Sequence, residues 1–377
     1  MSDSKLVVIF LRGGADSLSL VAPSADPHYI DARPASLRVG KGTDVAGIPL
    51  GPALADVDFR LHDAAGDLGT LFKAGDLSIV HATGLGEATR SHFDAEARIE
   101  RASDDLATGG WLGRTLRLLP GGAPLPALAV GTTLPESLRG GGAAVAPDLS
   151  ELVMASGHWL APALRARMQA GFGSHGSLGA TVSEILALSR TLEERYWHEA
   201  EDVFAAYAPA VEYPDTPLSA SLKTVARSMK ADLGLRIATV DYGGWDTHAH
   251  QAADFPALLG GLSASLMAFW RDLGPLQSET SVVVMSEFGR RLRSNASGGT
   301  DHGRAGAMMV LGPQARGGRL LGRWPGLANE ALEEGADLAV TTDYRAVLAE
   351  VLSGHMGIAD TGEVFPGLVP TAVGLFG

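Results

Sequence analysis

Five short apolar runs constrain the fold of this 377-residue chain more than any other sequence feature. They show no polar alternation, which is typical of strands covered on both faces of a sheet. The runs span residues 6–11, 77–80, 235–240, 281–285 and 307–311. Between them, apolar residues recur at three- and four-residue spacing, which predicts helices. These span residues 91–102, 178–205, 218–232, 255–273 and 343–352.

Alternating strands and helices predict an α/β fold, built as a three-layer sandwich with a mostly parallel central sheet. Residues 110–215 depart from this rhythm, because they combine Pro- and Gly-rich turns with one long helix. We interpret them as an inserted helical cap segment. The prediction is therefore a single domain over residues 1–377.

Composition excludes several classes of protein. The net charge of −13 repels phosphate backbones, so a nucleic-acid partner is not expected. No apolar run reaches the roughly 18 residues of a membrane span. The N-terminus lacks signal-peptide features, which predicts a cytoplasmic protein for the chain as written, or a periplasmic or exported one if the N-terminus was trimmed. The absence of cysteine leaves only oxygen and imidazole ligands for a metal.

The segment after the run at 235–240 holds the most informative side chains, which are Asp246, His248 and His250. Open α/β sheets bind ligands beyond the carboxyl ends of their strands. If a helix begins here, Asp246 and His250 share one face and can chelate one ion, while His248 points elsewhere. The alternative is a polar loop with surface histidines.

Two further strand edges carry the same residue types. Glu287 and Arg290 follow the run at 281–285, and Asp301 and His302 precede the run at 307–311. Carboxylates and imidazoles at three strand edges are difficult to explain as solvated surface alone. Together they predict a metal centre.

Two more positions have both a functional and a structural interpretation. Asp16 follows the first strand, where it could ligate a metal or cap a helix after a glycine turn. Ser91 begins the helix predicted at 91–102, where the positive end of the helix dipole suits a nucleophile that attacks an anionic ester. Serine is also a common helix N-cap. Arg90 and His92 flank this serine.

Six motifs together resemble the DUF1501 family, which is placed in the alkaline phosphatase and sulfatase superfamily. They are Phe-Leu-Arg-Gly-Gly-Ala-Asp-Ser at 10–17, Arg-Ser-His-Phe-Asp-Ala at 90–95, Gly-Trp-Asp-Thr-His at 244–248, Met-Ser-Glu-Phe-Gly-Arg at 285–290, Gly-Thr-Asp-His-Gly at 299–303 and Thr-Thr-Asp-Tyr-Arg at 341–345. The resemblance covers nearly the whole chain. It implies an alkaline-phosphatase-like fold and one or two divalent ions.

The resemblance also implies ligand sets. For the first ion, the matching residues are Asp246, His250 and His302. For the second ion Asp16 and Glu287 match, but Phe288 stands where the superfamily has a histidine. The missing donor could come from Asp301, His248 or His92. Zinc is favoured by imidazole ligation, with manganese, magnesium or iron as alternatives.

These residues predict a metal-dependent hydrolase of phosphate or sulfate esters that acts on a small anionic ester. Ser91, or a water activated by the metal, would attack the ester. Arg90 or Arg290 would neutralise the anion. His248 or His92 would handle the proton. One alternative is a non-catalytic metal- or anion-binding protein, with another protein as a possible partner. The other is an oxidase-type mononuclear iron site.

Overall fold

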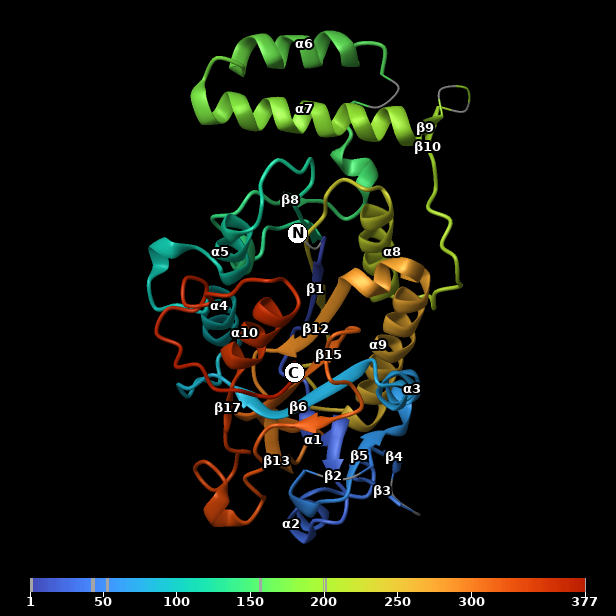
Figure 1. The fold of residues 1–377 in the computed structure, drawn as a ribbon. Helices are drawn as coiled ribbons and strands as arrows, with labels where there is room; N and C mark the ends of the chain where they lie inside the picture. The colour runs from blue at the N-terminus through green and yellow to red at the C-terminus, as the bar shows by residue number, and fades with distance from the viewer. Residues whose placement is uncertain are drawn as a thin grey trace.

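A nine-stranded mixed sheet forms the centre of the molecule (Figure 1). The computed structural model describes residues 3–41, 45–51, 54–155, 158–198, 200 and 202–376. The strand order is β16-β6-β15-β12-β1-β11-β7-β8, and β17 also pairs with β6. All five predicted strands lie in this sheet. The bounds are β1 Lys5–Leu11, β6 Leu77–Gly84, β7 Ala127–Val130, β8 Ala144–Val145, β11 Ile237–Tyr242, β12 Thr280–Ser286, β15 Gly306–Leu311, β16 Leu320–Leu321 and β17 Thr342–Asp343.

Helices cover both faces of this sheet. Successive side chains of a strand point to opposite faces, and β1 is buried along its whole length. Val7 and Ile9 pack in one core with α3, α8 and α9, whereas Val8 and Phe10 pack in a second core with α4, α5 and α10. The helices are α3 Gly66–Ala74, α4 His92–Arg101, α5 Trp111–Leu118, α8 Pro217–Lys230, α9 Gln251–Leu273 and α10 Tyr344–Gly354.

The prediction of a mostly parallel sheet is wrong, because β15 runs antiparallel to both β12 and β6. The chain leaves β12 through a hairpin of β13 (Arg290–Ser294) and β14 (Thr300–His302). Between β12 and β15 no helix carries the chain back along the length of the strands. β15 therefore begins at the end of the sheet where β12 stops. The start of β15 therefore lies at the same rim as the carboxyl ends of β1, β11 and β12, and this rim gathers the candidate residues.

The five predicted helices are present as α4, α7, α8, α9 and α10, but α7 (Gly176–Tyr196) ends before residue 205. A short pair of strands follows, β9 (Trp197–His198) and β10 (Val203–Phe204). The chain folds back because the rings of Tyr196 and Phe204 both pack on the guanidinium of Arg227, each with its centroid 4.6 Å away.

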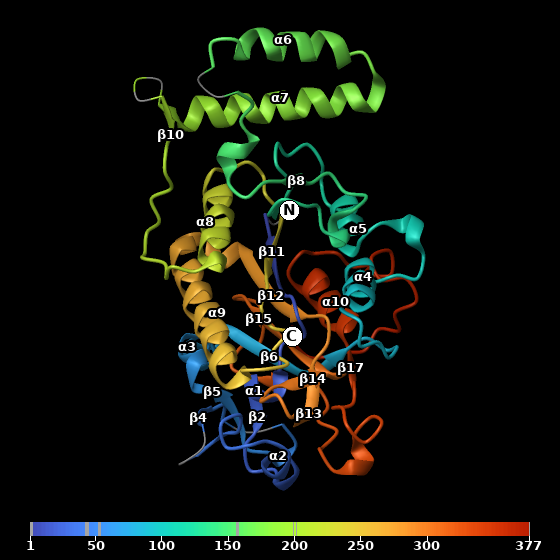
Figure 2. The same cartoon turned by 180° about the vertical axis from the view of Figure 1, so that it is seen from behind.

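Residues 110–215 contribute to two different parts of the molecule. β7 and β8 extend the central sheet. α6 (Ala161–Phe172) and α7 lie side by side at one end of the molecule, beyond the sheet (Figures 1 and 2). We call α6, α7 and the turn between them the α6–α7 hairpin.

A smaller four-stranded sheet in the N-terminal region was not predicted. Its strand order is β2 (Val21–Pro23), β5 (Phe59–His62), β4 (Val45–Pro49) and β3 (Val39–Gly40). The short helices α1 (Ser17–Leu20) and α2 (Pro27–Ala32) lie beside it in sequence. These strands are too short and irregular to stand out as apolar runs.

One helical stretch among the described residues, Gln251–Glu279, is long and apolar enough to cross a membrane by length and composition. It contains α9, which packs against α3 and α8 in the main core. Half of its most apolar window is buried inside the protein. A core helix has these properties. Its sequence contains no long uninterrupted apolar run, because serines and glycines lie between the apolar residues.

Candidate metal centre

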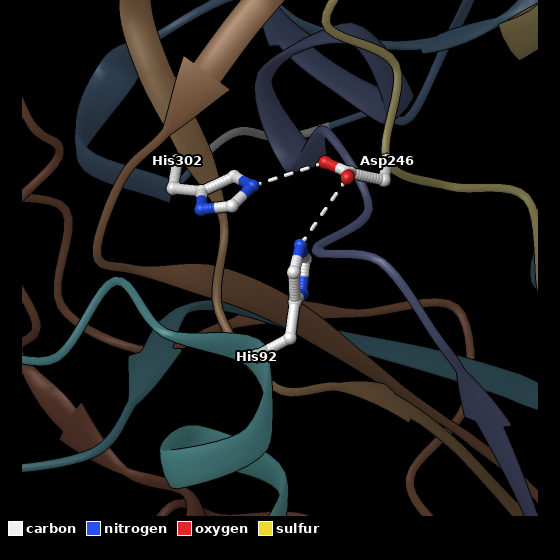
Figure 3. Close-up of side chains that lie close together, drawn as sticks. All are labelled: His92, Asp246 and His302. Atoms are coloured by element: carbon white, nitrogen blue, oxygen red, sulfur yellow. Dashed lines mark hydrogen bonds and ion pairs between the residues drawn. The ribbon is translucent and has the colours of Figure 1, made fainter.

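Three side chains from distant parts of the chain converge at the rim of the sheet (Figure 3). His92 is the first residue of α4, Asp246 lies in the loop after β11, and His302 ends β14. Each offers a donor atom, and these atoms lie within 4.8 Å of one another. In the part of the chain that the structure describes, no other three His, Asp or Glu side chains converge in this way.

Asp246 lies at the centre of the group. Its Oδ1 accepts a hydrogen bond of 2.6 Å from Arg290 and lies 3.0 Å from His302 Nε2. Its Oδ2 lies 3.4 Å from His92 Nε2. Burial acts to raise the pKa of Asp246, but the hydrogen bond from Arg290, the contact with His302 and the Arg290 charge outweigh it and lower the pKa to about 2. The carboxylate is therefore an anionic donor at neutral pH.

Both imidazoles are held with Nε2 directed at this carboxylate. His92 Nδ1 lies 2.7 Å from Glu287 Oε1, and His302 Nδ1 lies 2.8 Å from the carbonyl oxygen of Arg90. An ionised carboxylate and a carbonyl can only accept, so each Nδ1 carries the proton. Nε2, which faces Asp246, is then the ring nitrogen that a metal can bind. A histidine that ligates a metal usually has this second hydrogen bond.

His248, beside the group, is also held through Nδ1 while its Nε2 faces the group. Its Nδ1 lies 3.1 Å from Asp301 Oδ1, and its Nε2 lies 2.9 Å from His302 Nε2 and 3.1 Å from Asp246 Oδ1. Asn295 donates a 3.0 Å hydrogen bond to Asp301. That bond lowers the pKa of Asp301 more than burial raises it, and His248 lowers it further.

The donor chemistry fits a bound cation. The Nε2 atoms of His248 and His302 lie 2.9 Å apart, and both face Asp246. His92 Nε2 is buried and has no hydrogen-bond partner among the described residues. Nitrogen and carboxylate donors that converge in this way can ligate a cation placed between them. Two or three imidazoles and one carboxylate suit zinc or another transition metal.

The aromatic ring of Phe288 packs against two imidazoles of the group. The ring of Phe288 lies 4.9 Å from the rings of both His92 and His302, measured between centroids. Only glycine fits at position 14, because a Cβ there would lie 2.4 Å from the Phe288 ring. Phe288 therefore supports two imidazoles at the position where the resemblance would place a histidine ligand.

The structure does not assemble the second ion site expected from Asp16 and Glu287. Asp16 is fully buried, caps α1 and bonds to Arg33 (2.5 Å) and Gln251 (2.6 Å). Glu287 is also buried, and it accepts hydrogen bonds from the backbone N–H of Gly13, from Ser286 and from His92. Among the described residues, these two carboxylates share no bonding partner. Asp16 is a structural cap, and Glu287 orients an imidazole.

His250 does not join Asp246 as expected. It is exposed and precedes α9 with a left-handed φ of 54°. Residues 243–250 are not helical, so Asp246 and His250 do not share a helix face. His92 lies in the converging group instead. From the sequence, His92 was expected to carry a proton or to supply the missing donor of the second ion, and not to lie beside Asp246 and His302.

Both predicted arginines bind protein acceptors. Arg90 pairs with Asp337 at 2.5 Å and Glu334 at 2.8 Å. Arg290 is fully buried, and all three of its guanidinium nitrogens donate to protein acceptors. These acceptors are the carbonyl oxygens of Gly13, Gly14, Trp245 and Thr300 and the carboxylate of Asp246. Arg290 therefore orients Asp246 and joins the loops around it.

Ser91 lies directly beside the group in sequence. It is exposed at the N-cap position of α4, but its side chain makes no capping hydrogen bond. The carbonyl of Arg90 and the ring of His92, on either side of it, both contact the converging group. The structure thus does not support the helix-cap interpretation of the Ser91 hydroxyl.

Comparison with solved structures gives distant likenesses. A 2-O GAG sulfatase is 9% identical, with a TM-score of 0.39 over 84% of this chain and 66% of that one, slightly less than two thirds of its length. The zinc complex of the periplasmic domain of EcEptC from Escherichia coli is 8% identical, with a TM-score of 0.37 over 83% and 74%. Alkaline phosphatase from the Antarctic bacterium TAB5 is 9% identical, with a TM-score of 0.34 over 83% and 92%.

A search of curated proteins gave no match. The family model described as "Protein of unknown function (DUF1501)" matches residues 78–369. This range includes His92, Asp246, Glu287 and His302. Because the match spans well over half of the sequence, the chain belongs to the DUF1501 family.

Proposed function

We propose that this protein is a metal-dependent hydrolase of phosphate or sulfate esters. The observation that carries the proposal is the convergence of His92, Asp246 and His302, with each imidazole fixed through Nδ1. These three residues would hold a divalent ion, and zinc suits the donors best. When bound, such an ion supplies Lewis acidity that polarises the ester oxygen.

Ser91 is the proposed nucleophile. Its hydroxyl is not used as a cap, and it lies at the positive end of α4, where an anionic ester is favoured. Attack forms a bond from Ser91 Oγ to phosphorus or sulfur and breaks the bond to the leaving alcohol. Water then hydrolyses the serine phosphate or sulfate ester, which releases inorganic phosphate or sulfate and restores the Ser91 hydroxyl.

His248 is the proposed proton carrier. Attack requires a proton to leave Ser91 Oγ, and the departing alcohol requires one in return. The side chain of His248 is 43% exposed, so it is accessible at the edge of the group, and Asp301 holds its Nδ1. With Arg90 and Arg290 committed to protein partners, the helix N-terminus and the bound ion would offset the substrate charge.

The test combines metal analysis with turnover of p-nitrophenyl phosphate and p-nitrophenyl sulfate. Ser91→Ala is expected to keep the metal and lose turnover, and His302→Ala is expected to lose both. His248→Ala is expected to lower kcat by about 100- to 10,000-fold. His250→Ala is the matched control, since that imidazole lies outside the group, and should leave both readings unchanged. Bound metal with no turnover of either ester would overturn the proposal and favour a non-catalytic binding protein.

The donor set also favours a second candidate. Two histidines and one carboxylate are the ligands of mononuclear iron oxygenases, and His92, His302 and Asp246 have this composition. Oxygen consumption after anaerobic loading with Fe(II) would support this candidate. Ester turnover with zinc and no oxygen consumption with Fe(II) would exclude it.

A further inference from the structure

The α6–α7 hairpin exposes an unusual amount of apolar surface. Twelve large hydrophobic side chains in the described part of the chain are exposed, and six of them lie in the hairpin or in the two residues before it. They are Trp159 (81%), Leu160 (43%), Leu164 (45%), Phe172 (43%), Leu178 (52%) and Ile185 (48%). In α6 itself, only Ala161 is buried. Exposed apolar side chains are normal when scattered, but a concentration such as this marks an interaction surface.

One stripe of α7 shows that the surface lacks a cover over part of its length. Leu178, Ile185 and Leu192 recur every seven residues, so they lie close to one face of the helix. Leu192 is fully buried in the main core, whereas Leu178 and Ile185 are about half exposed. The body of the protein therefore covers the carboxyl end of this stripe and leaves the amino end uncovered.

The charge of the hairpin differs from that of the rest of the molecule. Between Glu151 and Glu184 the sequence has no acidic residue, although the whole chain carries a net charge of −13. Arg165 is paired with Glu193 within the hairpin. Arg167 is exposed and forms no ion pair with any described residue. Leu160, Leu164 and Arg167 are spaced as i, i+4 and i+7, so the unpaired cation shares a face with two of the exposed leucines.

Exposed acidic groups of the opposite sign lie on α7. Glu184 and Glu194 are exposed, and within the described residues neither forms an ion pair. A two-fold contact brings the same surface of two copies together, so α6 of one copy can pack on α7 of the other. Such packing would place Arg167 of each copy near these glutamates of its partner.

We infer that the α6–α7 hairpin is a self-association surface on which a second copy of this chain packs, forming a four-helix bundle. Two helices cannot enclose a core of their own, and a second pair completes one. The hairpin lies at one end of the molecule, beyond the sheet, in both views (Figures 1 and 2). A contact between two hairpins therefore keeps the negatively charged remainders of the two copies apart. This inference does not rest on the proposed hydrolase activity.

The test is sedimentation velocity of the full chain over a wide range of concentration. The wild-type protein is expected to form dimers, and Leu164→Glu and Ile185→Glu are expected to sediment as monomers. Val369→Glu is the matched control, because Val369 is 78% exposed and lies outside the hairpin, and it should remain dimeric. Far-ultraviolet circular dichroism and metal content should match the wild type in all three variants.

A charge swap tests the pairing between copies. Arg167→Glu should weaken the dimer by at least about tenfold, and adding Glu184→Arg or Glu194→Arg should restore it. A monomeric wild-type protein at all concentrations would overturn the inference. Binding of that monomer to phosphatidylglycerol vesicles would instead identify the hairpin as a lipid-binding surface, and dimers unaffected by Leu164→Glu and Ile185→Glu would place the interface elsewhere.

Discussion

Asp16 and Asp246 are both carboxylates beside a buried arginine, yet their surroundings give them different roles. The oxygens of Asp16 accept bonds from Arg33, Gln251 and other protein donors, and the side chain is fully enclosed. Asp246 is about half exposed and faces three imidazole nitrogens. A carboxylate enclosed by protein donors stabilises the fold, whereas an accessible one that faces several imidazole nitrogens is a candidate metal ligand.

Replacing Asp16 should therefore affect stability and not metal binding. Asp16→Ala leaves the fully buried Arg33 without its partner, which costs about 3–5 kcal/mol of unfolding free energy. Urea denaturation measures this loss. Metal per folded molecule should stay at the wild-type value, and a loss of metal with unchanged stability would return Asp16 to the ligand set.

The same ion pair predicts a pH dependence of stability. Burial acts to raise the pKa of Asp16, but Arg33 outweighs it and holds the pKa below its usual value. A carboxyl with a lowered native pKa contributes stability that is fully present above the unfolded pKa of about 3.9 and is lost as the pH falls toward the native value. Urea denaturation from pH 6 to pH 3 should show stability falling below about pH 4. The fall should be smaller in Asp16→Asn, and equal slopes would contradict this assignment.

At the scale of elements, the loop after β1 packs directly on the loop that carries Asp246. Gly13 has a φ of 118°, and a Cβ there would lie 2.4 Å from the backbone nitrogen of Asp246. Gly13→Ala should therefore displace Asp246 and lower both metal content and stability. Gly75→Ala is the control: it has a φ of 84° but open space around its Cβ position, so it should cost about 1 kcal/mol and leave metal content unchanged. Metal analysis and thermal unfolding of the two variants check this.

The element order also explains which site predictions from the sequence were wrong. The spacing of Asp246 and His250 predicted a shared helix face, but α9 begins only at Gln251. Local spacing could not show that α4, which is far away in sequence, brings His92 to the same rim. The antiparallel direction of β15 was also not predicted, because a buried apolar run looks the same in either direction.

At the scale of the whole molecule, the sequence predicted the location of the candidate residues better than the role of each one. Apolar runs located five strands of the central sheet, and the polar residues predicted at strand ends include Asp246 and His302, which lie together in the structure. The sequence left Asp16 open between a metal ligand and a helix cap, and the structure shows the cap. The partners of Arg290 depend on tertiary contacts, so its structural role was not predicted. The exposed face of the α6–α7 hairpin was also not predicted, since α6 was not among the predicted helices.

The proposed metal centre is tested most directly by the metal content of His92→Ala and His250→Ala, measured by inductively coupled plasma mass spectrometry after loading with zinc. His92→Ala should retain less than about a tenth of the wild-type metal under limiting zinc, because a donor from the converging group is lost. His250→Ala should retain all of it. Full metal in His92→Ala, or loss of metal in His250→Ala, would contradict the centre formed by His92, Asp246 and His302.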